Sequence, residues 1–243
     1  MRRALICSLV CGICLAAVAR ADDSNTDIAR LTMGSPVFPE GAWALELTPI
    51  YTMHRWNDAS GDTLEPSASL VHAFTERLTV AVGYEGIDGP RSIFRPAEVN
   101  VEGRYLVLDA PFLLAPYVLV GIPFINQPAS GLIGAQALKN LGSVSLRAVA
   151  EGEVDQALGG VTFRGDFEGG AYYRFGINGV IGAGLTYQTQ VGLFLSPVVG
   201  GRVGSNIFLS MQPSVGLTRG TPAVELLLQL TFYLGPFRAA GLD

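Results

Sequence analysis

Apolar and polar side chains alternate along short stretches of this chain, from about residue 42 to residue 234. Between residues 98 and 105, Glu98, Asn100, Glu102 and Arg104 occupy every second position, and valine, glycine and tyrosine lie between them. Between residues 226 and 234, leucine and phenylalanine occupy every second position. A period of two is typical of a β-strand whose two faces meet different surroundings. The pattern therefore predicts a chain built from β-strands.

The composition indicates what those strands surround. Charged residues make up 15% of the chain where about 25% is usual in soluble proteins, and the mean hydropathy is +0.37. After Val18, however, the sequence has no run of about 18 apolar residues that could form a membrane helix. In lipid, only helices and closed barrels satisfy all backbone hydrogen bonds. The sequence thus favours an all-β, transmembrane, antiparallel up-and-down β-barrel. A soluble β-sandwich also alternates, but its solvent-facing side would carry more charge.

Turn-forming residues separate the alternating stretches and set the expected strand count. The predicted strands lie near 42–54, 63–74, 78–86, 97–107, 113–124, 131–139, 143–155, 161–173, 178–189, 191–201, 206–217 and 223–234. The stretch 131–139 alternates poorly, so a short helix or part of a long loop is an alternative there. Without this stretch the count would be odd, whereas single-chain bacterial barrels have even strand numbers. We therefore expect twelve strands, with ten as the alternative.

The N-terminus has the three parts of an export signal. Arg2 and Arg3 supply positive charge, residues 4–18 are apolar, and Ala19-Arg20-Ala21 is a small-x-small cleavage site. A membrane-anchoring helix is the alternative, but the apolar stretch is short for a bilayer. Lipidation is disfavoured because bulky residues precede the cysteines in this stretch, where a small residue is needed. The pattern therefore predicts a cleaved signal peptide.

Export sets the expected organisation of the mature protein. Residues 1–21 form the signal peptide, 22–41 a periplasmic N-terminal segment, 42–235 the outer-membrane barrel and 236–243 a C-terminal tail. We expect the protein in the outer membrane of a Gram-negative bacterium, after cleavage near Ala21.

Cleavage also changes the chemistry of the chain. All three cysteines lie within the signal, so the mature protein is expected to have no disulfide, thiolate nucleophile or cysteine metal site. Cleavage removes three of the 16 basic residues, so 13 remain against 21 acidic ones, a formal net charge of 13 − 21 = −8. That balance argues against nucleic acid as a partner. No cofactor is implied.

The inward-facing positions of the predicted strands collect charged side chains. The candidate lumen-lining residues are Glu46, Glu85, Glu98, Glu102, Arg104, Arg147, Glu151, Glu153, Arg164, Asp166, Glu168 and Glu225. In one interpretation they line a water-filled acidic lumen that passes small solutes and disfavours anions. In the other, arginines and carboxylates cross-link into a plug, because buried charges are costly unless paired. Both stay open, since barrel interiors fill with side chains at eight strands and open into channels at sixteen.

Catalytic interpretations are weaker. Glu151 and Glu153 share a strand face and could act as acid and base, but lining a lumen accounts for them without further assumptions. His54 and His72 are expected near opposite ends of their strands, too far apart to share a metal. His72 is on the outward set of its strand, where packing with interfacial aromatic residues is expected. No catalytic or metal-binding residue is therefore predicted. The candidate interfacial aromatic residues are Trp43, Tyr51, Tyr84, Tyr105, Tyr173, Phe208 and Phe232.

Several short motifs carry a family resemblance. They are Gly41-Ala42-Trp43 leading into Glu46-Leu47, Phe74-Thr75-Glu76-Arg77-Leu78, Val82-Gly83-Tyr84, Arg104-Tyr105-Leu106, and the closing strand Val224–Leu234. In this layout the chain resembles small Gram-negative outer-membrane β-barrels. More narrowly, it resembles the outer-membrane transporters associated with the degradation of phenol and other aromatic compounds. The resemblance implies a barrel embedded in outer-membrane lipid and lipopolysaccharide.

Three hypotheses about function follow. The first is a monomeric passive channel or transporter for small solutes with an acidic lumen. The second is a structural or interaction barrel with a plugged lumen. The third, least favoured, is a membrane-embedded hydrolase.

Overall fold

The computed structural model describes residue 38 and residues 40–55, 61–87, 95–124, 129–157, 160–175, 179–204, 206–218 and 220–234. The expected signal peptide and C-terminal tail lie outside these ranges. Within them every regular element is a β-strand, and no helix there is long and apolar enough to cross a membrane. The strands are β1 (Trp43–Leu47), β2 (Ile50–Met53), β3 (Thr63–Glu65), β4 (Ser67–Ala73), β5 (Leu78–Ile87), β6 (Arg95–Tyr105), β7 (Leu113–Pro123), β8 (Ser130–Leu141), β9 (Val144–Ala157), β10 (Gly160–Phe175), β11 (Gly179–Gln188), β12 (Gly192–Arg202), β13 (Ile207–Gly216) and β14 (Val224–Leu234).

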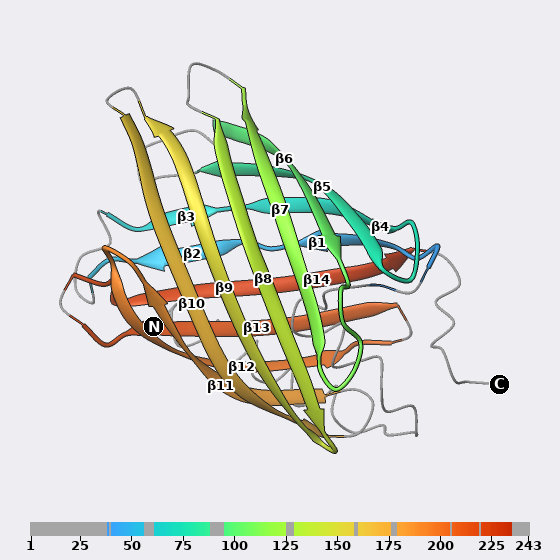
Figure 1. Ribbon diagram of the computed structural model, residues 1–243. Coiled ribbons are helices and arrows are strands. Elements are labelled where there is room, and N and C mark those ends of the chain that lie inside the picture. Colours follow the sequence, from blue (N-terminus) through green and yellow to red (C-terminus); the bar gives the residue numbers. More distant parts are fainter. Residues whose placement is uncertain are drawn as a thin grey trace.

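The strands form one closed antiparallel barrel (Figure 1). From β4 to β14 each strand pairs with the next one in the chain. The barrel closes because β14 pairs with β1 through Trp43↔Leu234 and with β2 through Ile50↔Leu227. Closure leaves no sheet edge, so the ladders satisfy the backbone donors and acceptors without water. The predicted fold class, an all-β up-and-down barrel, is confirmed.

Two prolines explain why twelve barrel strands are recorded as fourteen segments. Pro49 separates β1 from β2, and Pro66 separates β3 from β4. A proline has no N–H to give to a ladder. The register nevertheless continues across both interruptions, since Leu47 is opposite Ala68 and Ile50 is opposite Glu65. The predicted strands 42–54 and 63–74 are therefore each one interrupted strand, and the predicted total of twelve is confirmed.

The stretch that alternates poorly is a full barrel strand. β8 pairs along its whole length with β9, and with β7 through nine residues. Its inward face mixes polar Gln136 (3% exposed) with apolar Leu138 (2% exposed). Because the inward face is partly apolar, the usual contrast between two strand faces is weak here. The helix and loop alternatives are wrong.

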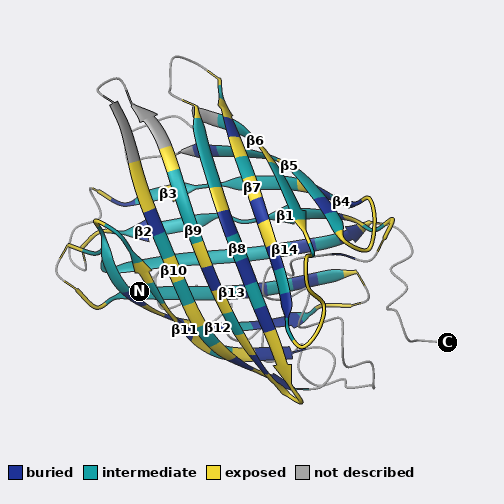
Figure 2. Ribbon diagram, viewed as in Figure 1, coloured by how far each residue is buried: buried dark blue, intermediate teal, exposed yellow. Residues whose placement is uncertain are grey.

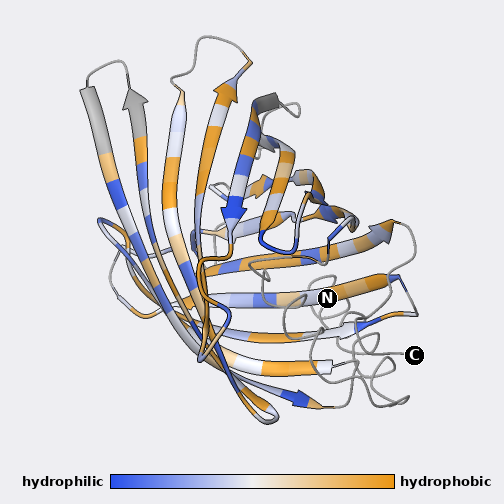
Figure 3. Ribbon diagram, turned by 45° about the vertical axis from the view of Figure 1, so that its right-hand side comes forward, coloured by the Kyte–Doolittle hydropathy of each residue, from blue (hydrophilic) through white to orange (hydrophobic). Residues whose placement is uncertain are grey.

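Burial alternates along the strands with a period of two (Figure 2). On β7, Ala115 and Tyr117 are buried inside the barrel, whereas Val118 and Ile122 are 51% and 57% exposed on the outside. Hydropathy alternates in the same way along neighbouring strands (Figure 3). An exposed apolar face around a closed barrel is the arrangement that lipid favours.

The prediction that Phe208 is an interfacial aromatic residue on the outer face is wrong. Trp43, Tyr105 and Tyr173 are outward and 42–53% exposed, but Phe208 is inside the barrel and 2% exposed. Residues 207–209 are all apolar, so the local pattern does not show which of them faces inward. The register of β13 against β14 decides it, because Phe208 is opposite Thr231, which is fully buried.

The barrel has two different ends. We call the end where β1 begins and β14 ends the terminal rim, and the opposite end the distal rim. Short turns join several strands at the terminal rim, including those at Gly142 and Gly204, whose φ angles are +61° and +77°. Glycine adopts such angles without the steric cost that other residues meet.

Candidate functional site

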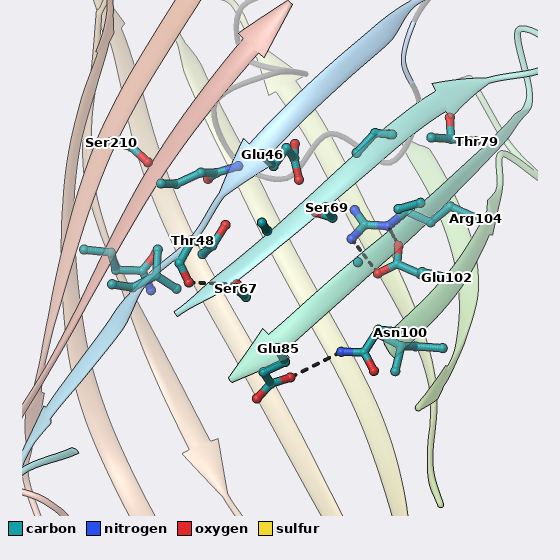
Figure 4. Close-up of a pocket in the computed structure, with 18 of the residues that line it drawn as sticks. Glu46, Thr48, Ser67, Ser69, Thr79, Glu85, Asn100, Glu102, Arg104 and Ser210 are labelled. Atoms are coloured by element: carbon teal, nitrogen blue, oxygen red, sulfur yellow. Dashed lines mark hydrogen bonds and ion pairs between the residues drawn. The ribbon is translucent and has the colours of Figure 1, made fainter. Parts of the chain in front are cut away.

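A cavity of about 360 Å³ lies inside the barrel. Residues of β1, β4, β5, β6, β7, β9, β10, β12, β13 and β14 line it. Figure 4 shows part of this lining, with Glu46, Glu85, Glu102 and Arg104 among the labelled side chains. Six of the twelve candidate residues line this cavity: Glu46, Glu85, Glu102, Arg104, Arg147 and Glu168. Each of these side chains points inward. Glu102 and Arg104 do so together because side chains two apart on a strand share a face.

One ion pair on the cavity wall is formed within β6. The Nε and Nη2 groups of Arg104 donate to the two carboxylate oxygens of Glu102, with Nη2 to Oε2 at 3.2 Å. The guanidinium also lies 5.2 Å from the ring centre of Tyr117 on β7. A fork-shaped pair over an aromatic ring holds arginine in one orientation. The charge of Arg104 is therefore committed to a neighbouring carboxylate.

A second ion pair joins β9 to β10. Arg147 Nη1 lies 3.3 Å from Glu168 Oε1, which also accepts a hydrogen bond from the Tyr172 hydroxyl at 3.0 Å. The Nε of Arg147 is buried and has no hydrogen-bond partner among the described residues. A buried donor of this kind normally finds water or a ligand. Arg147 and Tyr172 thus both bind Glu168 on this part of the wall.

The other two cavity carboxylates have no arginine pair. Glu46 on β1 has no ion pair with a described residue, although the charge of Arg104 is close enough to act on it. The same cavity is lined by serine, threonine and glutamine side chains: Thr48, Ser67, Ser69, Ser210, Gln212 and Gln229. Glu85 accepts a hydrogen bond from the neutral amide of Asn100 at 3.2 Å. The cavity therefore holds four carboxylates and two guanidiniums, and its formal charge is negative.

The remaining six candidates do not line this cavity. Glu98 accepts a hydrogen bond from Ser130 at 3.0 Å, and Glu151 accepts one from the Tyr117 hydroxyl. Glu153 and Arg164 form an ion pair at 3.4 Å in which both side chains are at least one third exposed. The structure places this group between the cavity and the distal rim: Glu98, Glu151, Glu153, Arg164, Asp166 and Glu225.

The structure separates the residues considered for catalysis or metal binding. Glu151 and Glu153 contact different partners, a tyrosine and an arginine. His72 stacks on Trp43 at 4.0 Å on the outer face of the terminal rim, whereas His54 follows β2 at the distal rim. Within the described ranges, no three histidine, cysteine or acidic side chains are close enough to hold a metal ion.

Sequence reasoning missed a residue that precedes the first predicted strand. Phe38 is 7% exposed and lines the cavity, although the barrel was expected to begin at residue 42. It belongs to an apolar cluster that we call the apolar collar: Phe38, Ala44, Val71, Ala73, Leu113, Leu138, Tyr172, Val180, Val198, Phe208 and Tyr233. Most of these residues lie near the terminal rim, so the collar forms one end of the cavity.

A closed twelve-stranded barrel with an apolar outer face and a hollow charged interior has the architecture of bacterial outer-membrane channels. The COG4313 outer membrane channel from Pseudomonas putida F1 is similar to this chain, with a TM-score of 0.56, 12% identity, and coverage of 82% of this chain and 97% of that one. The KdgM porin solved with disordered oligogalacturonate gives a TM-score of 0.57 at 9% identity, covering 79% and 99%. The NanC porin gives 0.55 at 12% identity, covering 78% and 100%.

These likenesses concern the fold alone. No family model and no curated protein matches the sequence. The chain thus has the fold of outer-membrane channels, in agreement with the broad resemblance of its motifs.

Proposed function

We propose that this protein is a passive channel of the outer membrane that lets small solutes through an acidic lumen and favours cations. The observation that carries the proposal is the hollow, polar cavity inside a closed barrel, where carboxylates outnumber guanidiniums by four to two. The solved channels of the same fold support it. The barrel would be a monomer that contacts lipid with its outward apolar side chains and lipopolysaccharide at the distal rim.

Two carboxylates would account for the selectivity. Glu102 and Glu168 each have an arginine partner, so their charges are largely balanced locally. Glu46 and Glu85 form no ion pair, and they lie between walls of low dielectric, where a charge acts over a longer range than in water. A cation passing the cavity would be attracted to them, and an anion would be repelled.

The test is the reversal potential of single channels in a planar bilayer under a potassium chloride gradient. The mature protein should conduct in discrete steps and favour potassium. The double variant Glu46→Gln, Glu85→Gln should lose a measurable part of that preference, because the cavity then becomes formally neutral while the carboxylates nearer the distal rim remain. The control is Glu76→Gln, since Glu76 lies exposed in the turn between β4 and β5. A folded barrel that carries no current would overturn the proposal.

A plugged structural barrel is the second candidate. The apolar collar favours it, because apolar side chains from strands around the barrel fill the interior near the terminal rim. The same recording separates the two candidates, since a plugged barrel stays silent until the plug is weakened.

A further inference from the structure

We infer that Phe38 is folded back into the barrel as an aromatic constriction, and that it determines which solutes pass between the cavity and the terminal rim. The effect of Phe38 on permeation rests on the proposed channel function, but the position of Phe38 can be tested without measuring any current.

Phe38 is held on the inner face of the barrel by contacts with two strands. Its backbone N–H donates to Thr79 Oγ1 on β5 at 3.4 Å, and Thr79 is 3% exposed. Its ring lies 6.4 Å from the ring of Tyr233 on β14, inclined at 54°. Since β14, β1, β4 and β5 are consecutive in the barrel, Phe38 spans the inner face of this part of the wall.

A turn at Gly41 precedes β1. Gly41 has a φ of +76°, and its N–H donates to the carbonyl of Ala73 at 2.8 Å. Ala73 in turn donates to the carbonyl of Ala42 at 3.0 Å. This pair of hydrogen bonds fixes the start of β1 against the end of β4. Glycine tolerates this left-handed conformation, and Phe38, three residues earlier, lies inside the barrel.

The surroundings of Phe38 are more apolar than the part of the cavity that holds the ion pairs. The collar around Phe38 includes the large apolar or aromatic side chains Leu138, Phe208 and Tyr172. A few buried polar side chains lie at the same end of the barrel, among them Thr79, Gln136 and Thr231. Hydrophobic constrictions in channels resist water and ions because a narrow apolar passage dewets. Phe38 is the collar residue supplied from outside the strands, so it alone could be removed without changing the wall.

The first experiment measures where residue 38 lies. Residues 22–243 contain no cysteine, so a single cysteine can be introduced into the mature chain. In the folded barrel, Phe38→Cys should react with a maleimide about tenfold or more slowly than Glu40→Cys, because a buried thiol must wait for local opening. Glu40 is exposed in the same segment and is the matched control. Equal labelling rates would overturn the inference, whether or not the barrel conducts.

The second experiment measures the consequence for permeation. Phe38→Ala should raise the single-channel conductance roughly twofold or more, because it widens an apolar constriction. Phe38→Trp should lower it. Phe74→Ala is the control: Phe74 belongs to the same rim but is 56% exposed on the outside, against His72. Folding of each variant is checked by heat-dependent migration on a gel.

The outcomes separate this inference from the proposed function. A silent wild type with a conducting Phe38→Ala variant supports the constriction and shows that the wild-type barrel is plugged. Conductance of folded Phe38→Ala equal to that of the wild type overturns the constriction and leaves the channel intact. If both are folded and silent, the channel proposal falls and with it the role of Phe38 in permeation, and the labelling rates still decide whether residue 38 lies inside the barrel.

Discussion

The apolar collar and the cavity share several strands but differ in the side chains that dominate their interiors. In the collar, Leu138, Val180 and Phe208 are at most 2% exposed. In the cavity, Arg104 and Glu102 keep 27% and 16% of their side chains exposed although they form an ion pair. Packed apolar side chains contribute to the stability of the barrel, whereas charges inside it are costly unless paired or hydrated. The collar is thus suited to stability and the cavity to passage.

The largest expected effect comes from truncating a large side chain in the apolar collar. Phe208→Ala should lower the free energy of unfolding by about 3–5 kcal/mol, because it leaves a cavity among buried apolar side chains. Urea titration of the protein refolded into phospholipid vesicles measures it. Phe167→Ala is the matched control, since Phe167 is 54% exposed on the outer face and lipid can fill the space. Equal losses for the two variants would show that the collar is no better packed than the outer face.

Overfilling the collar should have a smaller effect. A Cβ added at Gly200 would lie 2.8 Å from Phe208 Cζ and 2.9 Å from the Cβ of Ser210. Gly200→Ala should therefore destabilise the barrel by about 1–3 kcal/mol through overpacking. The added change Phe208→Leu should restore part of the loss, because it removes one of the two clashes. Gly103→Ala serves as control, since a Cβ there meets nothing within 4 Å.

The same contrast explains what could be predicted from the sequence about the fold. Where inward and outward residues differ in polarity, as in β6, alternation alone gives the strand and its orientation. Where both faces are apolar, as in residues 207–209, it gives the strand but not the face, so Phe208 was placed on the wrong side. The local pattern did not indicate β8. This strand was expected only because leaving it out would give an odd number of strands.

The candidate site was predictable only in part. The inward positions of Glu46 and Arg104 follow from strand parity, yet parity does not say which carboxylate has an arginine partner. That depends on the stagger between strands, as when Arg147 on β9 reaches Glu168 on β10. Phe38 lies outside every alternating stretch, and its inward position depends on contacts with Thr79 and Tyr233 that the pattern does not show. The glycine in the Gly41-Ala42-Trp43 motif was the available signal for the turn that precedes β1.

The smallest expected effect compares two ion pairs at different depths in the barrel. Side chains of the Arg147–Glu168 pair are 19% and 15% exposed, and those of Arg164–Glu153 are 44% and 33% exposed. Double-mutant cycles with glutamine at each position measure their coupling from urea unfolding.

The exposed pair should give about 1 kcal/mol or less, because solvent screens it. The deeper pair should give roughly 1.5–3 kcal/mol, as expected for hydrogen bonds to charged groups with limited access to water. If instead the deeper pair couples as weakly as the exposed one, the cavity must be hydrated as fully as the distal rim. Water would then be continuous from the distal rim to the apolar collar, and the collar with Phe38 would be the principal barrier between the lumen and the terminal rim.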